Sequence, residues 1–248
     1  MDLFRNLHDC FLEKASIAKV VNITVGLRYT AVMTDDGGMG LSFTFQNNEH
    51  CCPKGSAYRD YEGQSAIELL ENILSPSPLS RSIGLALINA LNFSVADKLP
   101  EDDGDTLWMD AFDVKQGSHV AMVGFFKPLM QKFEKRGALV EVVDDSHGIG
   151  DKKDFYEKLG GWADVLLITA TSILNGTTEE VLAHVSPDTA VIMLGPSTPM
   201  VMDAFSHLPV RVLAGTVPTD FEAVLKAVRH GEGTPVIHRF SRKVIIMK

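Results

Sequence analysis

The sequence predicts an α/β protein in two parts: a small α+β domain over residues 1–105 and a Rossmann-like domain over 106–248, whose sheet is doubly wound and mostly parallel. Two observations predict this fold class. In the first part, short β-branched and aromatic runs are separated by tight-turn residues. In the second part, continuous apolar runs alternate with helical patterns, which is typical of parallel strands buried on both faces.

The chain begins with a predicted amphipathic helix. Leu3, Phe4, Leu7 and Phe11 form one apolar stripe, which charged residues interrupt. This stripe could pack on its own domain or on a neighbouring molecule. Because two-fold dimers are the commonest oligomers, we expect a homodimer.

A three-stranded antiparallel meander follows, with breaks at Gly26 and at 35–38, where Asp-Gly and Gly-Gly pairs favour a tight hairpin turn. Two helices are predicted next, at about 65–74 and 78–91. Ser77 is the expected N-cap of the second helix and Pro78 its first residue. Apolar residues at helical spacing let this second helix cover one side of the meander. Residues 99–118 are rich in acids and helix breakers, so they are expected to form the linker.

The second part carries six apolar runs that predict strands. They lie at 119–125, 139–143, 164–170, 190–195, 210–214 and 243–247. Helical segments lie between them, among them PLMQKFEKRG, TTEEVLAHV and DFEAVLKAVRHG. Ligands of open parallel sheets bind at the carboxyl ends of the strands. We therefore read the residues that follow each strand as a candidate site.

The loops after these strands combine hydroxyl, amide and carboxylate groups with glycine. The candidate ligand-binding residues among them are Gly124, Lys127, Asp144, Thr171, Ser172, Asn175, Thr177, Gly195, Ser197 and Thr198. For any one loop, helix capping or a turn is a sufficient explanation. The whole set at one sheet edge favours a binding site.

No dinucleotide fingerprint follows the first strand, since Gly124 stands before the bulky Phe125 and Phe126. Asp144, 20 residues further on, lies where such folds often place a ribose-binding acid, and a solvated loop acid is an equal alternative. Lys127 at a helix start could hold an anion or could simply be solvated. The cofactor is left open.

Composition narrows the partners and the location. The net charge of -9 without a Lys/Arg run argues against nucleic acid. The sequence has no apolar run of about 18 residues, so no membrane span is expected. Three cysteines (Cys10, Cys51, Cys52) provide no disulfide framework, and the N-terminus lacks the apolar stretch of a signal peptide, so a reducing, cytoplasmic location is expected.

No tight metal site is expected. The run His50-Cys51-Cys52 is too cramped to surround one ion, and no second ligand pair completes a tetrahedral set. Asp144, Asp145 and His147 could serve at most as supplementary ligands, and an acidic surface turn is the more common explanation.

Three motifs carry a family resemblance: GFFKPL after the first strand, ITATSILNGTTEEVL after the third and GPSTPM after the fourth, together with LINAL in the first part. The chain resembles the "putative heavy-metal chelation" family of uncharacterised prokaryotic proteins. The resemblance implies an enolase-N-terminal-like first domain and a site in the cleft between the domains. It makes Thr171, Asn175, Thr177, Ser197 and Thr198 the best candidates and adds Asn89 from the first domain.

Two functions are compatible with these residues. The first is a protein or enzyme that acts on a small metal chelator or a chelated metal in the interdomain cleft. The second is a non-catalytic sensor or carrier of a nucleotide-like or anionic metabolite. In either case the partner is a small molecule. Replacing Asn175 or Ser197 by alanine is expected to weaken ligand binding and to leave folding nearly intact.

Overall fold

The computed structural model describes residues 2–45 and 59–248. Its N-terminal half holds an antiparallel sheet in the order β1-β2-β3, and its C-terminal half a six-stranded sheet in the order β5-β4-β6-β7-β8-β9. All neighbours in the larger sheet are parallel except β8 and β9, which are antiparallel. The predicted α/β class is therefore confirmed.

The N-terminal half follows the predicted order of elements. They are α1 (Asp2–Ile17), β1 (Val20–Val25), β2 (Tyr29–Thr34), β3 (Met39–Phe43), α2 (Ala66–Leu70), the 3-10 helix η1 (Glu71–Leu74), α3 (Pro78–Leu91) and α4 (Phe93–Ala96). The helix α3 begins as predicted, because the Ser77 side chain accepts a hydrogen bond from Ser80 N and Pro78 needs no donor there. The turn before β3 has Gly37 at a φ of 84°, a left-handed conformation that glycine adopts without strain.

The stripe of the first helix is buried inside its own chain. Leu3, Phe4, Leu7 and Phe11 belong to the largest core cluster, and α1 packs on α2, η1 and the C-terminal 3-10 helix η2 (Met202–Phe205). Glu179 caps the start of α1 by accepting hydrogen bonds from the backbone N–H of Asp2 and Leu3. The stripe is thus not available to a neighbouring molecule, and the homodimer stays a prediction without this support.

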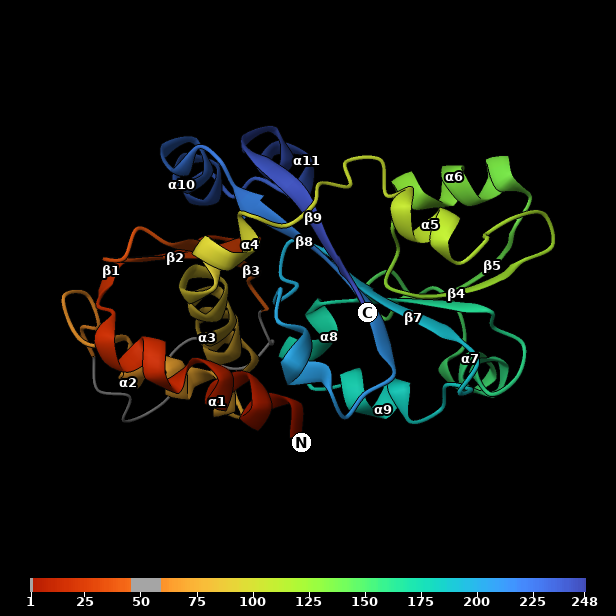
Figure 1. Ribbon diagram of the computed structural model, residues 1–248, viewed down its shortest axis with the longest axis horizontal. Helices are drawn as coiled ribbons and strands as arrows, with labels where there is room; N and C mark the ends of the chain where they lie inside the picture. The colour runs from red at the N-terminus through yellow and green to blue at the C-terminus, as the bar shows by residue number, and fades with distance from the viewer. Residues whose placement is uncertain (1, 46–58) are drawn as a thin grey trace.

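The C-terminal half alternates strands and helices. Its elements are α5 (Leu107–Ala111), β4 (His119–Val123), α6 (Lys127–Arg136), β5 (Leu139–Val143), α7 (Lys152–Leu159), β6 (Val165–Thr169), α8 (Thr171–Asn175), α9 (Thr178–Leu182), β7 (Ala190–Leu194), η2, β8 (Val210–Pro218), α10 (Phe221–Arg229), α11 (Thr234–Ile237), η3 (His238–Phe240) and β9 (Ser241–Met247). Figure 1 shows α5 and α6 on one face of the sheet and α7 and α9 on the other.

The acidic stretch 99–118, expected as an irregular linker, is part of the fold. Asp102 accepts hydrogen bonds from the backbone N–H groups of Thr106 and Leu107 at the start of α5. Trp108 in α5 is buried and contacts Phe133 of α6 edge to face, with ring centroids 6.2 Å apart. The expectation failed because Trp108 and Met109, both buried, anchor a helix too short to show a sustained apolar period in the sequence.

The helices between β8 and β9 pack on the N-terminal sheet. Val224 and Val228 of α10 and Ile237 of α11 share a core cluster with Tyr29 and Leu41 of the meander. The other face of the meander packs on α3, so the small sheet lies between helices from both halves of the chain (Figure 1). The division at residue 105 stays a prediction, since the C-terminal half completes the core of the N-terminal half.

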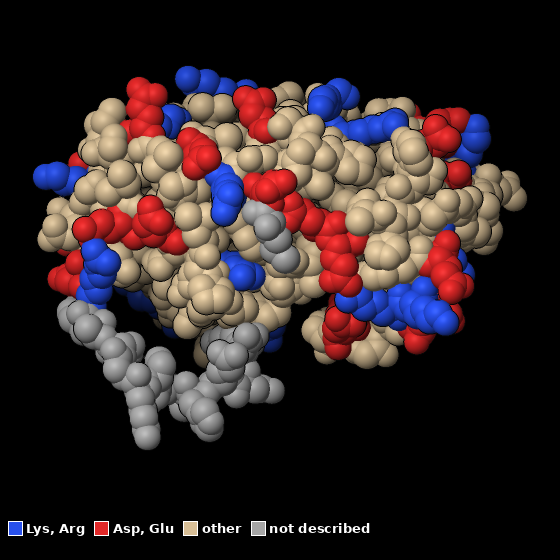
Figure 2. Space-filling model, turned by 90° about the horizontal axis from the view of Figure 1, so that it is seen from below, with Lys and Arg blue, Asp and Glu red and all other residues tan. Residues whose placement is uncertain are grey.

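Among the described residues, no helix is both long and apolar enough to cross a membrane. On the face in Figure 2, lysine and arginine side chains lie between aspartate and glutamate side chains, so the described part of that face forms no extended basic surface.

Candidate ligand-binding site

A cavity of about 950 Å³ lies where the ends of the parallel strands meet the N-terminal sheet. Its floor includes the loops after β4 and β6, the two neighbouring strands from which the chain winds in opposite directions. Open parallel sheets form a crevice at such a switch point, because the two following helices leave on opposite faces. A volume of this size fits a small organic molecule.

Most of the predicted residues meet in this cavity. Those that line it are Gly124, Lys127, Asp144, Thr171, Ser172, Asn175, Thr177, Gly195 and Ser197. Two predicted residues, Asn89 and Thr198, are not among the lining residues. Thr198 is 2% exposed, and its hydroxyl has no hydrogen-bond partner in the described structure.

Two glycines bring the backbone close to the cavity. Gly124 has a φ of 89° and Gly195 a φ of 122°, conformations that residues with a side chain rarely adopt. A Cβ atom on Gly124 would lie 3.0 Å from Cγ2 of Thr169 on the neighbouring strand. Glycine is therefore required at position 124, both for the turn after β4 and for close packing of this turn against the end of β6.

The loop after β5 is organised around the Asp144 carboxylate. Its Oδ2 accepts a hydrogen bond from Phe125 N at 2.8 Å and lies 3.0 Å from His147 Nδ1, while Ser146 Oγ donates to Oδ1. Burial raises the pKa of Asp144, but the hydrogen bonds from Ser146, Phe125 and His147 outweigh it and lower the pKa below its ordinary value. The anion thus orients the His147 ring and ties together the loops after β4 and β5.

The loop between α8 and α9 holds its own polar groups in place. The Asn175 side-chain oxygen accepts from the backbone N–H and the hydroxyl of Thr177, at 3.1 and 2.8 Å. The Thr171 hydroxyl lies 3.0 Å from that of Thr169. Ser172 is buried and bonds to Thr178 Oγ1 at 2.7 Å. Within the described residues the Asn175 amide donates no hydrogen bond, which leaves its N–H groups for a ligand.

Ser197 and Asn89 join the two halves of the chain. The Ser197 hydroxyl, 2% exposed, accepts a hydrogen bond from Phe43 N at 2.7 Å. The Asn89 amide donates to the carbonyl oxygens of Leu41 and Ser197, at 2.8 and 3.3 Å. These bonds give both side chains an architectural role.

The N-terminal side of the cavity is formed by residues that sequence reasoning missed. They are Arg28, Tyr29, Phe43 and Phe45, from the start of β2 and the end of β3. The Tyr29 hydroxyl forms a hydrogen bond of 2.6 Å with Oγ1 of Thr234, the first residue of α11. The sequence predicted the meander and a helix that covers one of its sides, but no sequence signal showed that one end of this sheet would face the distant strand-end loops.

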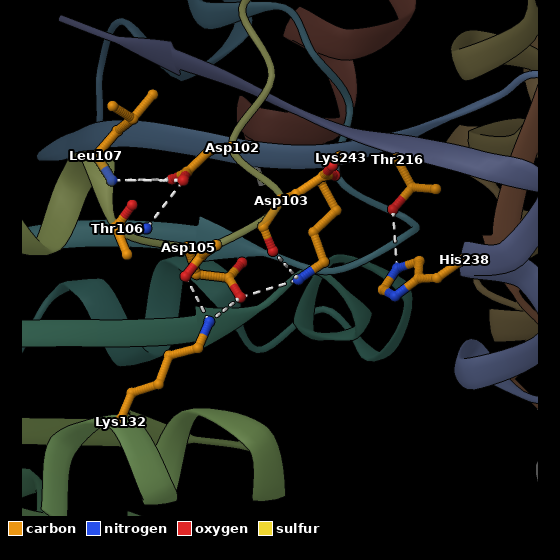
Figure 3. A network of polar contacts seen from close by, with 10 residues as sticks. Asp102, Asp103, Asp105, Thr106, Leu107, Lys132, Thr216, His238 and Lys243 are labelled. Carbon is orange, nitrogen blue, oxygen red and sulfur yellow. Dashed lines mark hydrogen bonds and ion pairs between the residues drawn. The ribbon is translucent and has the colours of Figure 1, made fainter. Parts of the chain in front are cut away.

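A second group of missed residues lies where the 99–106 segment passes the first half of β9 (Figure 3). Asp105, at a φ of 48°, is bridged by Lys132 at 2.8 Å and Lys243 at 2.9 Å. His238 Nε2 lies 3.3 Å from Thr216 Oγ1. Burial lowers the pKa of His238 and Lys243 lowers it further, whereas Asp105 and Asp103 raise it, and the net shift is downward. Of this group Asp105, Thr216, His238 and Lys243 line the cavity.

In residues 2–45 and 59–248, no group of three or more His, Cys, Asp or Glu side chains is arranged to hold a metal ion. Asp144 and His147 lie together, but they form no such group with Asp145. The run His50-Cys51-Cys52 lies outside the described residues.

Comparisons with known proteins relate this architecture to a family. Two family models, each described as "Putative heavy-metal chelation", match residues 8–92 and 107–247. No curated protein matches the chain.

Two solved structures from this family, both of unknown function, have the same fold. The structure from Pyrococcus horikoshii has a TM-score of 0.80 at 19% identity and covers 99% of this chain and 100% of its own. The structure from Desulfitobacterium hafniense DCB-2 has a TM-score of 0.78 at 20% identity and covers 99% of this chain and 97% of its own. The likeness to an enolase N-terminal domain stays a prediction.

Proposed function

Since the chain belongs to the "putative heavy-metal chelation" family, we propose that it binds a small metal chelator, or the chelated metal, in the cavity between its two halves. One observation carries the proposal. Nine of the residues predicted from the strand-end loops line a single cavity of about 950 Å³, and the N-terminal sheet closes its other side. Ligand sites of small molecules are concave and combine apolar walls with a few fixed polar groups.

The donor groups favour a ligand that brings its own metal. The lining offers hydroxyls, an amide and carboxylates, held by hydrogen bonds within one loop or between neighbouring loops. Such groups hydrogen-bond an organic molecule, whereas a tight metal cage needs several converging ligands. In this proposal the metal is cargo, and Asn175 and Thr171 contact the chelator.

Isothermal titration calorimetry with Fe(III)-citrate and Ni(II)-histidine tests the proposal, with the free metals and free chelators as separate titrants. We expect a chelate or free chelator to bind and Asn175→Ala to weaken it about tenfold, the worth of one or two hydrogen bonds. Asn22→Ala is the matched control, because that amide is hydrogen-bonded within the N-terminal half. Unchanged affinity in Asn175→Ala, or binding of the free metals alone, would contradict the proposal.

A carrier of an anionic metabolite is the second candidate function. It is favoured by Arg28 and Lys127, which line the cavity and form no ion pair with any described residue. Mass spectrometry of the small molecule that co-purifies with the native protein separates the two functions, because it shows whether the bound molecule is a metal chelator or another anionic metabolite. The cytoplasmic location of the protein also stays a proposal.

A further inference from the structure

The cavity has aromatic walls on two sides. On the N-terminal side Tyr29, Phe43 and Phe45 form a row in which successive rings meet edge to face, with centroids 6.1 and 6.5 Å apart. On the strand-end side Phe125 and Phe126 line the same cavity. Aromatic rings prefer edge-to-face or offset contacts with other rings. A planar aromatic ligand would therefore gain such ring contacts from these walls, in addition to a fit of shape.

Phe125 belongs to none of the hydrophobic core clusters of the described residues. Its side chain is 40% exposed, although its backbone N–H is fixed by the Asp144 carboxylate. A large apolar side chain held at a cavity wall leaves apolar surface in water, and a ligand that covers this surface gains the corresponding free energy. The neighbouring His147 ring lies 6.2 Å from it and extends the same wall.

Each aromatic wall has a cation beside it in sequence. Arg28 precedes Tyr29, and its side chain lies over Gly233, where a Cβ atom would be 3.5 Å from the Arg28 Cδ. Lys127 follows Phe126 at the start of α6. The other lining lysines are paired, Lys152 with Glu180 and Lys243 with Asp105, whereas among the described residues Arg28 and Lys127 have no carboxylate partner.

From these walls and cations we propose that the cavity takes a planar aromatic ring that bears an anionic group, the ring lying against Phe125 and the row of Tyr29, Phe43 and Phe45, the anion facing Arg28. This inference rests on the proposed function and names its ligand class. The shared chemistry has two sources: an aromatic carboxylate or phenolate that can chelate a metal, and a nucleotide.

Calorimetry with matched probes tests the ring and the charge separately. 2-Naphthoate is compared with its saturated analogue decahydronaphthalene-2-carboxylate and with the neutral 2-naphthamide. We expect naphthoate to bind about threefold to tenfold more tightly than either, the range expected for one aromatic contact or one exposed charge pair. 2,3-Dihydroxybenzoate and AMP distinguish the two sources, and the tighter binder identifies the class.

Two variants connect these preferences to the residues. Phe125→Leu should abolish the preference for the aromatic over the saturated probe, and Arg28→Gln the preference for the anionic over the neutral one. Phe112→Leu and Arg5→Gln, both outside the cavity, should change neither. Equal affinity for the aromatic and saturated acids, a preference that survives Phe125→Leu, or no binding of any probe would overturn the inference.

The proposed function can fail separately. If Fe(III)-citrate or Ni(II)-histidine binds the wild type and loses affinity in Asn175→Ala, whereas no aromatic probe binds, the cavity function stands while the aromatic inference falls. If neither the chelates nor the aromatic probes bind, both fall.

Discussion

At the residue scale, we assign Ser197 a structural role and Asn175 a role in ligand binding. Ser197→Ala leaves the partly buried N–H of Phe43 without its acceptor, so we expect unfolding by urea to show a loss of about 1–3 kcal/mol. Asn175→Ala removes an oxygen that serves only a surface loop, and its stability should change by no more than about 1 kcal/mol. Equal stability of the two variants would contradict this assignment. The sequence predicted that both alanine variants fold almost normally. We keep this prediction for Asn175→Ala and now expect a loss of stability for Ser197→Ala.

His238 makes stability depend on pH near neutrality. Its pKa is lower in the folded chain than the ordinary value of about 6.5, so the unfolded chain binds the proton more tightly. The contribution is complete above the unfolded pKa and is lost as pH falls through 6.5 toward the folded pKa. NMR titration should place the His238 midpoint below 6.5, and Lys243→Met should raise it, because Asp105 and Asp103 then face the ring without that cation. A midpoint at or above 6.5 in the wild type would refute the argument.

At the element scale, the backbone of β3 at Gly40 lies directly against the backbone of α3. A Cβ atom on Gly40 would lie 2.1 Å from Ala90 N and 2.2 Å from Ala86 O, so Gly40→Ala must push the strand off the helix. We expect thermal or urea unfolding to show a loss of about 3 kcal/mol or more. Gly161→Ala is the control, since its Cβ would meet nothing within 4 Å, and a similar loss there would remove the packing explanation.

Elements were more predictable than their partners. The apolar runs predicted five parallel strands and the C-terminal strand, because buried strands have a signature within a few residues of sequence. The amphipathic pattern of α10 predicted a helix, but amphipathicity does not say which sheet its apolar face covers. The structure places α10 on the meander, and this contact depends on residues almost 200 positions away.

The same limit applies to the candidate site. Strand-end residues such as Asn175 and Asp144 were predictable because one topological rule collects them at one edge. Arg28 and Phe43 were not, since they lie in a meander whose neighbour is set by tertiary packing. Asn89 was expected at the ligand, but its amide bonds the backbone that joins the halves.

At the scale of the whole molecule, the two halves share one core. The largest cluster contains Leu7 and Leu85 from the N-terminal half together with Phe205 and Leu213 from the C-terminal half. Because the two halves share this core, the cavity between them is part of one packed structure. In it the row of Tyr29, Phe43 and Phe45 faces the strand-end loops.

The central claim is that a small ligand binds between the halves and contacts both. Backbone hydrogen–deuterium exchange, with and without the chelate or free chelator that binds most tightly in calorimetry, tests it most directly. We predict slower exchange in residues 124–128 and 169–177 and also in 28–45, with no change in α10. Protection confined to the outer helices, or to one half of the chain, would contradict the claim.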